Sequence, residues 1–263
     1  MRFLDLSVPI ENGISADYSD NQPQITYYGH QETVAAWQTR YPALDPGVLP
    51  NREAYANERI SLSTHNGTHV DAPWHYASQM GDGSRPMTID EIPLDWFYGP
   101  GVKIDVRSYP DGYVLTEADM RSELGKIGRP LRAGDIVLIN TSAGGRYDDP
   151  NYLGMGCGVG REATLLLTRQ GVRVAGIDAY SWDAPFAAMI KRYAESGDEK
   201  LIFEGHRAGA LIPYCHIEKL TNLDQLPSHG FSVACFPTKI RGGSAGWTRA
   251  VAIFDEQMPP TVY

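Results

Sequence analysis

The segment from residue 65 to residue 75 constrains this chain more than any other. It reads HNGTHVDAPWH, which places three histidines and one aspartate within eleven positions. Gly67 and Pro73 interrupt it and β-branched residues lie between them, so a helix is a poor interpretation. In a straight strand His65 and His69 would lie about 13 Å apart, at about 3.3 Å per residue, which is too far for one ion. A shared metal therefore predicts a bend at Gly67, because glycine tolerates positive φ.

His65, His69 and Asp71 are candidate ligands of a divalent metal. Imidazole nitrogen and carboxylate oxygen bind zinc and harder ions such as manganese, and a catalytic site uses about three protein ligands plus an open position for water. His75 is ambiguous, because it could be a fourth ligand or a general acid–base with an ordinary pKa near ~6.5. The alternative is that these are scattered loop or core histidines. The clustering of three of the chain's seven histidines favours the metal site.

The local pattern predicts a mixed α/β fold with more strand than helix. Residues 59–64 alternate apolar and polar as a half-buried strand does, so we place the motif on a strand end and the loop after it. Short β-branched runs predict further strands over residues 3–8, 102–107, 135–140, 172–177, 231–236 and 249–254. Helices are predicted from Thr116, over 160–170 up to Gly171, and over 184–195.

Composition indicates a single globular domain over residues 1–263. The chain is 42% hydrophobic and 21% charged, and no repeat or low-complexity linker divides it. A net charge of −9 without a basic cluster argues against a nucleic-acid partner. No apolar run approaches the roughly 18 residues that span a bilayer, and Asp5 would interrupt an export signal. Three widely spaced cysteines fit reduced thiols, so we expect a cytoplasmic protein without a membrane partner.

The stretch HNGTHVDAPWH resembles the His-x-Gly-Thr-His-x-Asp-x-Pro-x-His motif of the cyclase-like metal hydrolases, which include bacterial kynurenine formamidases and isatin hydrolases. Further blocks resemble the family in the same order along nearly the whole chain: FLDLSVPIENG, GDIVLINT, GIDAYSWD, EGHRAGALIPYCHIEKLTNLDQLP and FPTKIRGGSAGWTRAVAI. The resemblance implies a strand-rich, swivelling β/β/α barrel-like core with flanking helices. It also favours a homodimer or homotetramer.

The resemblance to kynurenine formamidases implies two metal ions. It assigns His65, His69 and Asp71 to the first ion, and a later histidine and a glutamate twelve positions beyond it to the second. His206 and Glu218 stand at that separation, and Asp71 and Glu218 would then be candidates to bridge the ions. Without the resemblance, the later pair would be a surface histidine and an ordinary glutamate. Isatin hydrolases resemble single-manganese enzymes, so one or two ions of Zn²⁺ or Mn²⁺ remain open.

Together these features predict metal-assisted hydrolysis of a non-peptide amide or lactam C–N bond in a small, aryl substrate. Water is the nucleophile, and the resemblance implies that His75 donates and accepts the proton. An isatin-type lactam hydrolase is the nearest alternative to an arylformamidase-like enzyme. A metal-dependent lyase or cyclase acting through an enolate and a non-catalytic metal-binding protein are the others.

Three more residues are candidates for substrate binding. Trp74 and Tyr76 flank the catalytic loop and could line an aryl pocket, although a tryptophan beside a proline is also ordinary packing. Asp178 follows a buried apolar run, and it could orient a site group or cap the turn into the next helix. Residues 15–58, which the shortest formamidases lack, carry six aromatic residues amid proline and glycine. We predict that this segment is a lid or a subunit contact that covers the site.

Overall fold

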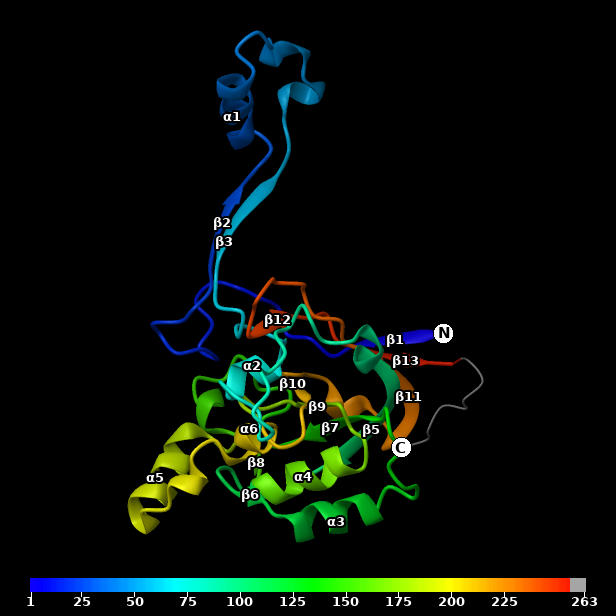
Figure 1. Ribbon diagram of the computed structural model, residues 1–263. Coiled ribbons are helices and arrows are strands. Elements are labelled where there is room, and N and C mark those ends of the chain that lie inside the picture. The colour runs from blue at the N-terminus through cyan, green and yellow to red at the C-terminus, as the bar shows by residue number, and fades with distance from the viewer. Residues whose placement is uncertain (256–263) are drawn as a thin grey trace.

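The computed structural model describes residues 1–255 of the chain and arranges them around one curled sheet (Figure 1). Its strands are β1 (Arg2–Asp5), β4 (His69–Asp71), β5 (Tyr98–Asp105), β7 (Ile136–Asn140), β9 (Val174–Ile177), β10 (Cys215–Glu218), β11 (His229–Ala234), β12 (Ala245–Trp247) and β13 (Val251–Phe254). They lie in the order β1-β13-β11-β5-β7-β9-β10-β4-β12. The central strands β5, β7, β9 and β10 run parallel, and the outer strands pair antiparallel.

The predicted fold class is confirmed, because the sheet curls into a half-barrel with helices flanking it. All six predicted strand runs overlap strands of this sheet. The three predicted helices correspond to α3 (Glu117–Gly125), α4 (Arg161–Arg169) and α5 (Phe186–Ser196). Helix α3 begins with a capping box in which the side chains and backbone amides of Thr116 and Asp119 bond reciprocally. Helix α4 lies just before Gly171, whose φ of 89° ends it as predicted.

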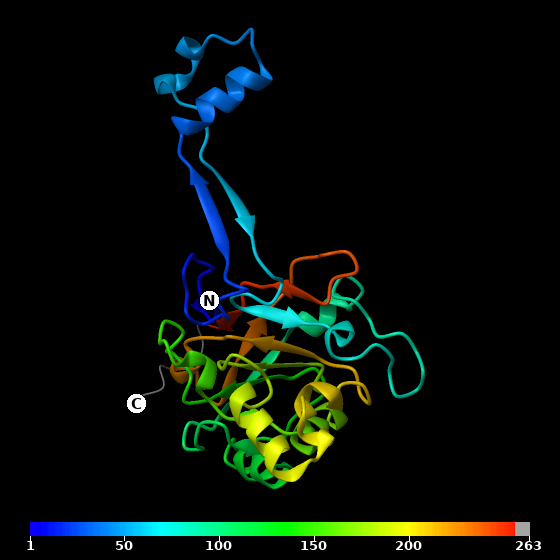
Figure 2. The ribbon, with the colours of Figure 1, turned by 90° about the vertical axis from the view of Figure 1, so that its left-hand side faces the viewer.

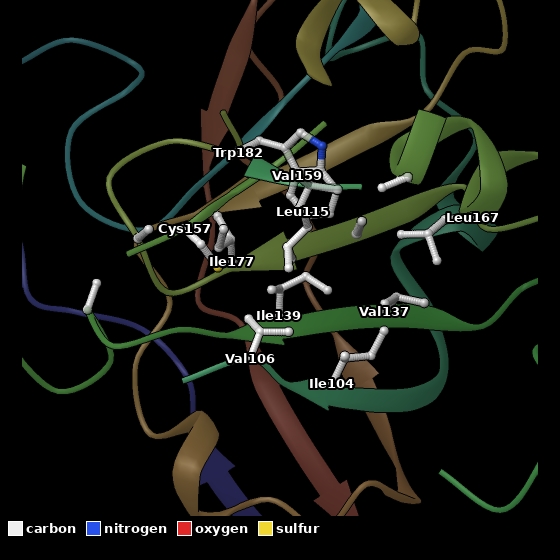
Figure 3. Close-up of a cluster of buried hydrophobic side chains, with 14 of the residues drawn as sticks. Ile104, Val106, Leu115, Val137, Ile139, Cys157, Val159, Leu167, Ile177 and Trp182 are labelled. Carbon is white, nitrogen blue, oxygen red and sulfur yellow. The ribbon is translucent and has the colours of Figure 1, made fainter. Parts of the chain in front are cut away.

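Alternation along the strands produces two buried apolar clusters. Val137 and Ile139 of β7 belong to the first cluster, whereas Ile136 and Leu138 belong to the second. The first cluster also contains residues of α3 and α4, and Figure 3 shows part of it around Ile139 and Trp182. On β10, Cys215 and Ile217 belong to the second cluster. The residues between and after them, His216 and Glu218, therefore face the opposite side of the sheet.

A hairpin arm projects from this body. We define the arm as residues 24–61, which comprise β2 (Gln24–Tyr28), α1 (Glu32–Arg40), two short 3-10 turns (Pro46–Val48 and Pro50–Arg52) and β3 (Asn57–Ser61). Both views place α1 at the far end, away from the sheet (Figures 1 and 2). The predicted strand before the motif overlaps β3, but its half-burial is wrong because every residue of β3 is exposed. Among the described strands, β3 pairs only with β2.

The remaining elements are short. They are α2 (Pro73–Tyr76), α6 (Glu204–Ala208), the strand pair β6 (Val114–Leu115) and β8 (Gly158–Val159), and the 3-10 turns Leu94–Phe97, Tyr152–Gly154, Glu199–Leu201 and Leu223–Gln225. Within residues 1–255, no helix is both long and apolar enough to cross a membrane. The three cysteines, Cys157, Cys215 and Cys235, are free and buried. This agrees with the expectation of reduced thiols.

Candidate metal centre

The predicted bend in the histidine segment is confirmed at Gly67, whose φ is 59°. The turn brings the ring centroids of His65 and His69 to 5.1 Å, instead of the separation expected in a straight strand. After the turn the chain forms β4 and then the one-turn helix α2, which begins at Pro73. The motif therefore spans a turn, a strand and a helical turn, rather than a strand end and a loop. Helix α2 carries His75 back toward the other histidines.

Strand pairing adds two side chains from a distant part of the sequence. Strands β4 and β10 are antiparallel neighbours, and their register sets Asp71 opposite His216 and His69 opposite Glu218. Directly opposed residues project to the same face of a sheet. All four side chains therefore meet on one face, and each has at most 8% of its side chain exposed.

Each carboxylate directs its two oxygens to different neighbours. Asp71 Oδ1 lies 3.2 Å from His65 Nε2 and 3.5 Å from His69 Nε2. Glu218 Oε2 also lies 3.5 Å from His69 Nε2. We name Asp71 and the two histidines beside its Oδ1, His65 and His69, the outer group. The name reflects the position of His65, whose side chain is 25% exposed.

The second carboxylate oxygens face another pair of histidines. His216 Nε2 lies 3.1 Å from Asp71 Oδ2 and 3.3 Å from Glu218 Oε1. His206 Nε2, from α6, lies 3.7 Å from Glu218 Oε1. We name these four side chains the inner group, and all of them are buried. Asp71 belongs to both groups, and Glu218 reaches both with its two oxygens.

These distances fit divalent metal ions. Four donors at about 2.0–2.2 Å from one ion lie about 3.3–3.6 Å from each other, close to the spacings within each group. Several donor atoms have no hydrogen-bond partner within residues 1–255: His69 Nε2, His216 Nε2 and both carboxylate oxygens of Asp71. Such buried polar atoms are costly unless another partner satisfies them. The donor set is therefore that of a site for divalent cations.

Neighbouring groups orient two of the imidazoles. His69 Nδ1 lies 2.9 Å from the Gly67 carbonyl oxygen, and His206 Nδ1 lies 2.5 Å from Asp183 Oδ2. A ring that donates from Nδ1 keeps the lone pair on Nε2, which is the nitrogen directed at the carboxylates. Asp183 also accepts a hydrogen bond from the Gly205 amide, which fixes the start of α6. Asp183 is thus a supporting residue of the centre.

The carboxylates of the centre are held in their charged form. Burial would raise the pKa of Asp71, but the neighbouring imidazoles, His69 and His75 first, hold that pKa well below its ordinary value. The pKa of Glu218 is likewise held low against burial, with His216 as the main cause. Burial would lower the pKa of His216, yet the two carboxylates raise it to about 10. Two buried negative charges therefore attract positive charge to this point.

His75 lies on the open side of the centre, where its side chain is 32% exposed. Its Nδ1 lies 3.0 Å from His65 Nε2, and its Nε2 lies 3.8 Å from Asp71 Oδ2. Burial lowers its pKa to about 4, aided by repulsion from His206 and His65 and opposed by Asp71. His75 therefore differs from an ordinary imidazole, because its surroundings favour the neutral form.

The two aromatic candidates beside His75 differ in their surroundings. Trp74 is 42% exposed at the surface. The Tyr76 hydroxyl donates to the Tyr214 carbonyl oxygen at 2.6 Å, and its ring stacks on His216 with centroids 6.1 Å apart. Tyr76 therefore packs against His216 of the inner group, and its hydroxyl is bonded to the protein backbone.

Asp178 holds a different part of the structure. Its buried carboxylate accepts hydrogen bonds from Asn140 Nδ2 (2.6 Å), the Thr141 amide (2.8 Å) and Thr141 Oγ1 (2.7 Å). These bonds join the end of β9 to the loop after β7, rather than capping a turn into the next helix. Within the described residues, the carboxylate of Asp178 makes no side-chain hydrogen bond to a residue of the metal centre.

A row of aromatic rings leads away from the centre. Of its members, only Tyr18 belongs to the aromatic segment 15–58 that the sequence predicts to cover the site. Phe203 lies 6.0 Å from His206 between ring centroids, and Phe186 lies 5.5 Å from Phe203. Tyr180 and Tyr18 continue the row at 5.7 and 5.6 Å. We name these four residues the aromatic row. They come from separate parts of the sequence, so no local pattern marks all four.

Sequence reasoning missed His216, although a signal for it exists. His216 stands two residues before Glu218, and in a strand residues two apart share a face. Lys219, which follows Glu218 in the sequence, was missed as well. Its Nζ donates a hydrogen bond to the His65 carbonyl oxygen at 2.9 Å and forms an ion pair with Asp17. This buried ion pair fixes the backbone of the turn that carries His65.

A buried cluster of histidines and carboxylates, open on one side beside a neutral imidazole, defines a metal-dependent enzyme. The family described as putative cyclase matches residues 4–184, and the chain belongs to this family. The chain is 30% identical over 195 residues to a kynurenine formamidase of Salinibacter ruber, covering 73% of this chain and 77% of that protein. A kynurenine formamidase of Erythrobacter litoralis is 28% identical over 193 residues, covering 73% and 74%.

The fold is similar to that of isatin hydrolase A from Ralstonia solanacearum. The TM-score is 0.74 at 24% identity, and the match covers 97% of this chain and 92% of that chain. The predicted membership in the cyclase-like metal hydrolases is thus confirmed by the sequence and by the fold.

Proposed function

We propose that this protein is a metal-dependent hydrolase that cleaves the C–N bond of a small aryl amide, as an arylformamidase does. The observation that carries the proposal is the convergence of the outer and inner groups around Asp71 and Glu218, with His75 beside them. The kinship with kynurenine formamidases supports the same reaction class.

We propose that His65, His69 and Asp71 hold one divalent ion and that His206 and Glu218, with Asp71, hold a second. When bound, such an ion lowers the pKa of its water from about 15.7 to about 7 and polarises a carbonyl oxygen. Imidazole and carboxylate ligands without thiolate suit Zn²⁺ and Mn²⁺ alike, so either ion fits this donor set.

His75 carries the proton in this proposal. A neutral imidazole accepts a proton from the attacking water, and its lowered pKa makes the resulting imidazolium a better proton donor than an ordinary one. His75 then delivers this proton to the departing nitrogen. Its position on the exposed side of the outer group allows both transfers without moving the buried ligands.

We propose that the aromatic row and Trp74 bind the aryl part of the substrate. Phe203 is 38% exposed and Tyr18 is 42% exposed, so each presents part of its ring to solvent. Flat aromatic surfaces favour stacked or edge-on contacts with a planar ring. Phe203 is the member nearest the metal centre, through His206.

An isatin-type lactam hydrolase is the second candidate, and the fold similarity to isatin hydrolase A supports it. The test is a panel of N-formyl arylamines and aryl lactams, assayed with metal-analysed protein in ¹⁸O-labelled water. We expect hydrolysis of at least one class, with one labelled oxygen in the acid product. A product without label would instead indicate a lyase or cyclase, and turnover of neither class would remove the proposal.

We also propose that the arm joins copies of this chain into a homodimer or homotetramer. Tyr27, Val48 and Ile60 are 61%, 66% and 53% exposed, although they are large and apolar. Such side chains, carried on a hairpin away from the body, suit a surface supplied by another chain. The three buried thiols suit a reducing compartment, so we propose the cytoplasm.

A further inference from the structure

We propose that His216 is a fourth protein ligand of the inner ion, which makes the inner group a closed metal site and leaves the outer group as the open, catalytic one. The inference rests on the proposed function for the presence of metal. His216 itself lies outside both the histidine segment and the His206–Glu218 pair that the resemblance assigns.

The position of Nε2 carries the inference. His216 is fully buried, and Nε2 lies 3.1 Å from Asp71 Oδ2 and 3.3 Å from Glu218 Oε1. Within residues 1–255, neither ring nitrogen of His216 has a hydrogen-bond partner of good geometry. A buried imidazole nitrogen is normally bonded, yet this one faces two carboxylate oxygens without a hydrogen bond to either. A shared cation explains that direction.

Aromatic rings pack against the His216 ring. The indole of Trp182 and the ring of Tyr76 both lie near-parallel to it, at interplanar angles of 25° and 20°, each 6.1 Å away between centroids. The His206 ring meets it edge-on at 4.5 Å. Packing therefore aims Nε2 before any ion arrives, which is the condition for a tight ligand.

The two groups then differ in access to solvent. The inner group offers four buried donors, from two histidines and two carboxylates, and tetrahedral sites with four protein ligands are closed. The outer group offers His65, His69 and Asp71, and Glu218 Oε2 lies 3.5 Å from His69 Nε2, but its His65 side is exposed next to His75. Water and substrate would therefore reach an ion in the outer group, whereas an ion in the inner group would be enclosed by protein ligands.

The test compares His216→Gln and His216→Ala with Cys215→Ala. Cys215 lies on the same strand, is equally buried and faces the second apolar cluster, so its variant controls for loss of packing in β10. Metal per chain is measured by mass spectrometry after dialysis against increasing chelator, and the absorption spectrum of Co²⁺-loaded protein reports ligand number. His216→Gln keeps most of the side-chain volume if the alanine variant folds poorly.

We expect wild-type protein and Cys215→Ala to hold two ions and to release one first. Both His216 variants should release the inner ion at chelator concentrations at least ~100-fold lower, with a changed Co²⁺ spectrum. Wild-type affinity and spectrum in these variants would overturn the inference. So would a single ion that His65→Ala removes and His216→Ala retains, although metal-dependent hydrolysis would then stand. Wild-type protein without any bound metal would instead remove the proposed function.

Discussion

The metal centre and the arm are organised in opposite ways. In the centre, His69 and Asp71 are completely buried, and their positions follow from pairing between β4 and β10 deep in the sheet. In the arm, β3 is exposed along its whole length and pairs with β2 alone among the described strands. The centre depends on packing within one chain, whereas the arm carries apolar side chains that its own chain leaves uncovered. Changes in the centre should therefore alter chemistry, and changes in the arm should alter assembly.

The largest effect is expected for Asp71→Ala, which removes an oxygen from both metal groups. We expect kcat/KM to fall by at least ~10³ and both ions to be lost, because the ions share this carboxylate. Metal content and hydrolysis of the best amide in the panel measure the effect. Asp224→Ala, at an exposed carboxylate of the same body, is the control. Retained metal and activity in Asp71→Ala would show that the centre is not where the chemistry occurs.

His75→Ala separates proton transfer from metal binding within the centre. We expect kcat to fall by ~10²–10⁴ while both ions remain, because His75 transfers a proton and leaves the ligand set complete. Steady-state kinetics and metal analysis of the same preparation provide both numbers. Loss of an ion in this variant would reassign His75 as a ligand.

Asp178 tests how burial outside the metal centre makes the stability of the protein depend on pH. Burial raises its folded-state pKa to about 7, although Thr141 and Asn140 oppose this. Because the folded protein then binds the proton more tightly than the unfolded chain does, stability should fall as pH rises from 5 to 8. The loss is on the order of 2 kcal/mol and should be absent in Asp178→Asn. Urea titrations of both proteins at the two pH values measure it, and equal slopes would contradict this pKa.

The smallest effect on stability is expected when the arm is shortened. Tyr28 pairs with Asn57 at the end of the hairpin, so residues 29–56 can be replaced by an Asn-Gly turn. We expect the body's free energy of unfolding to change by less than ~1 kcal/mol and its metal content to persist. Light scattering should show a smaller assembly than the wild type forms.

Tyr27→Thr with Ile60→Thr is the matched control, because it keeps the hairpin and removes two exposed apolar side chains. Weakened association in both variants would assign the contact to those side chains. An unchanged assembly after shortening would show that the arm has another use, such as the lid considered for residues 15–58.

Much of the body could be predicted from the sequence, because its strands are short β-branched runs between glycine, proline and aspartate. The bend at Gly67 followed from ligand reach alone. The exposure of β3 could not be predicted, because an alternating sequence pattern does not show whether the strand packs against a core. The lowered pKa of His75 depends first on burial and then on repulsion from His206 and His65, all of which tertiary structure produces.

Some residues of the candidate site could be predicted from the sequence, and others could not. His206 and Glu218 came from a spacing that the family resemblance supplied, and the structure brings both to the centre. The spacing of His216 two residues before Glu218 marks it only once 215–218 is known to be a strand, and its position opposite Asp71 requires the pairing with β4. The aromatic row joins Tyr18 to three rings of residues 180–203, and only Tyr18 stood in a segment that the sequence marked as rich in aromatic residues.

The most direct test of the account is anomalous scattering from crystals of the purified protein, recorded on both sides of the zinc and manganese absorption edges. The account predicts two anomalous peaks per chain, one bonded to Asp71 Oδ1 with His65 and His69, the other bonded to Asp71 Oδ2 with Glu218 and His206. A map without a peak between these side chains would contradict it.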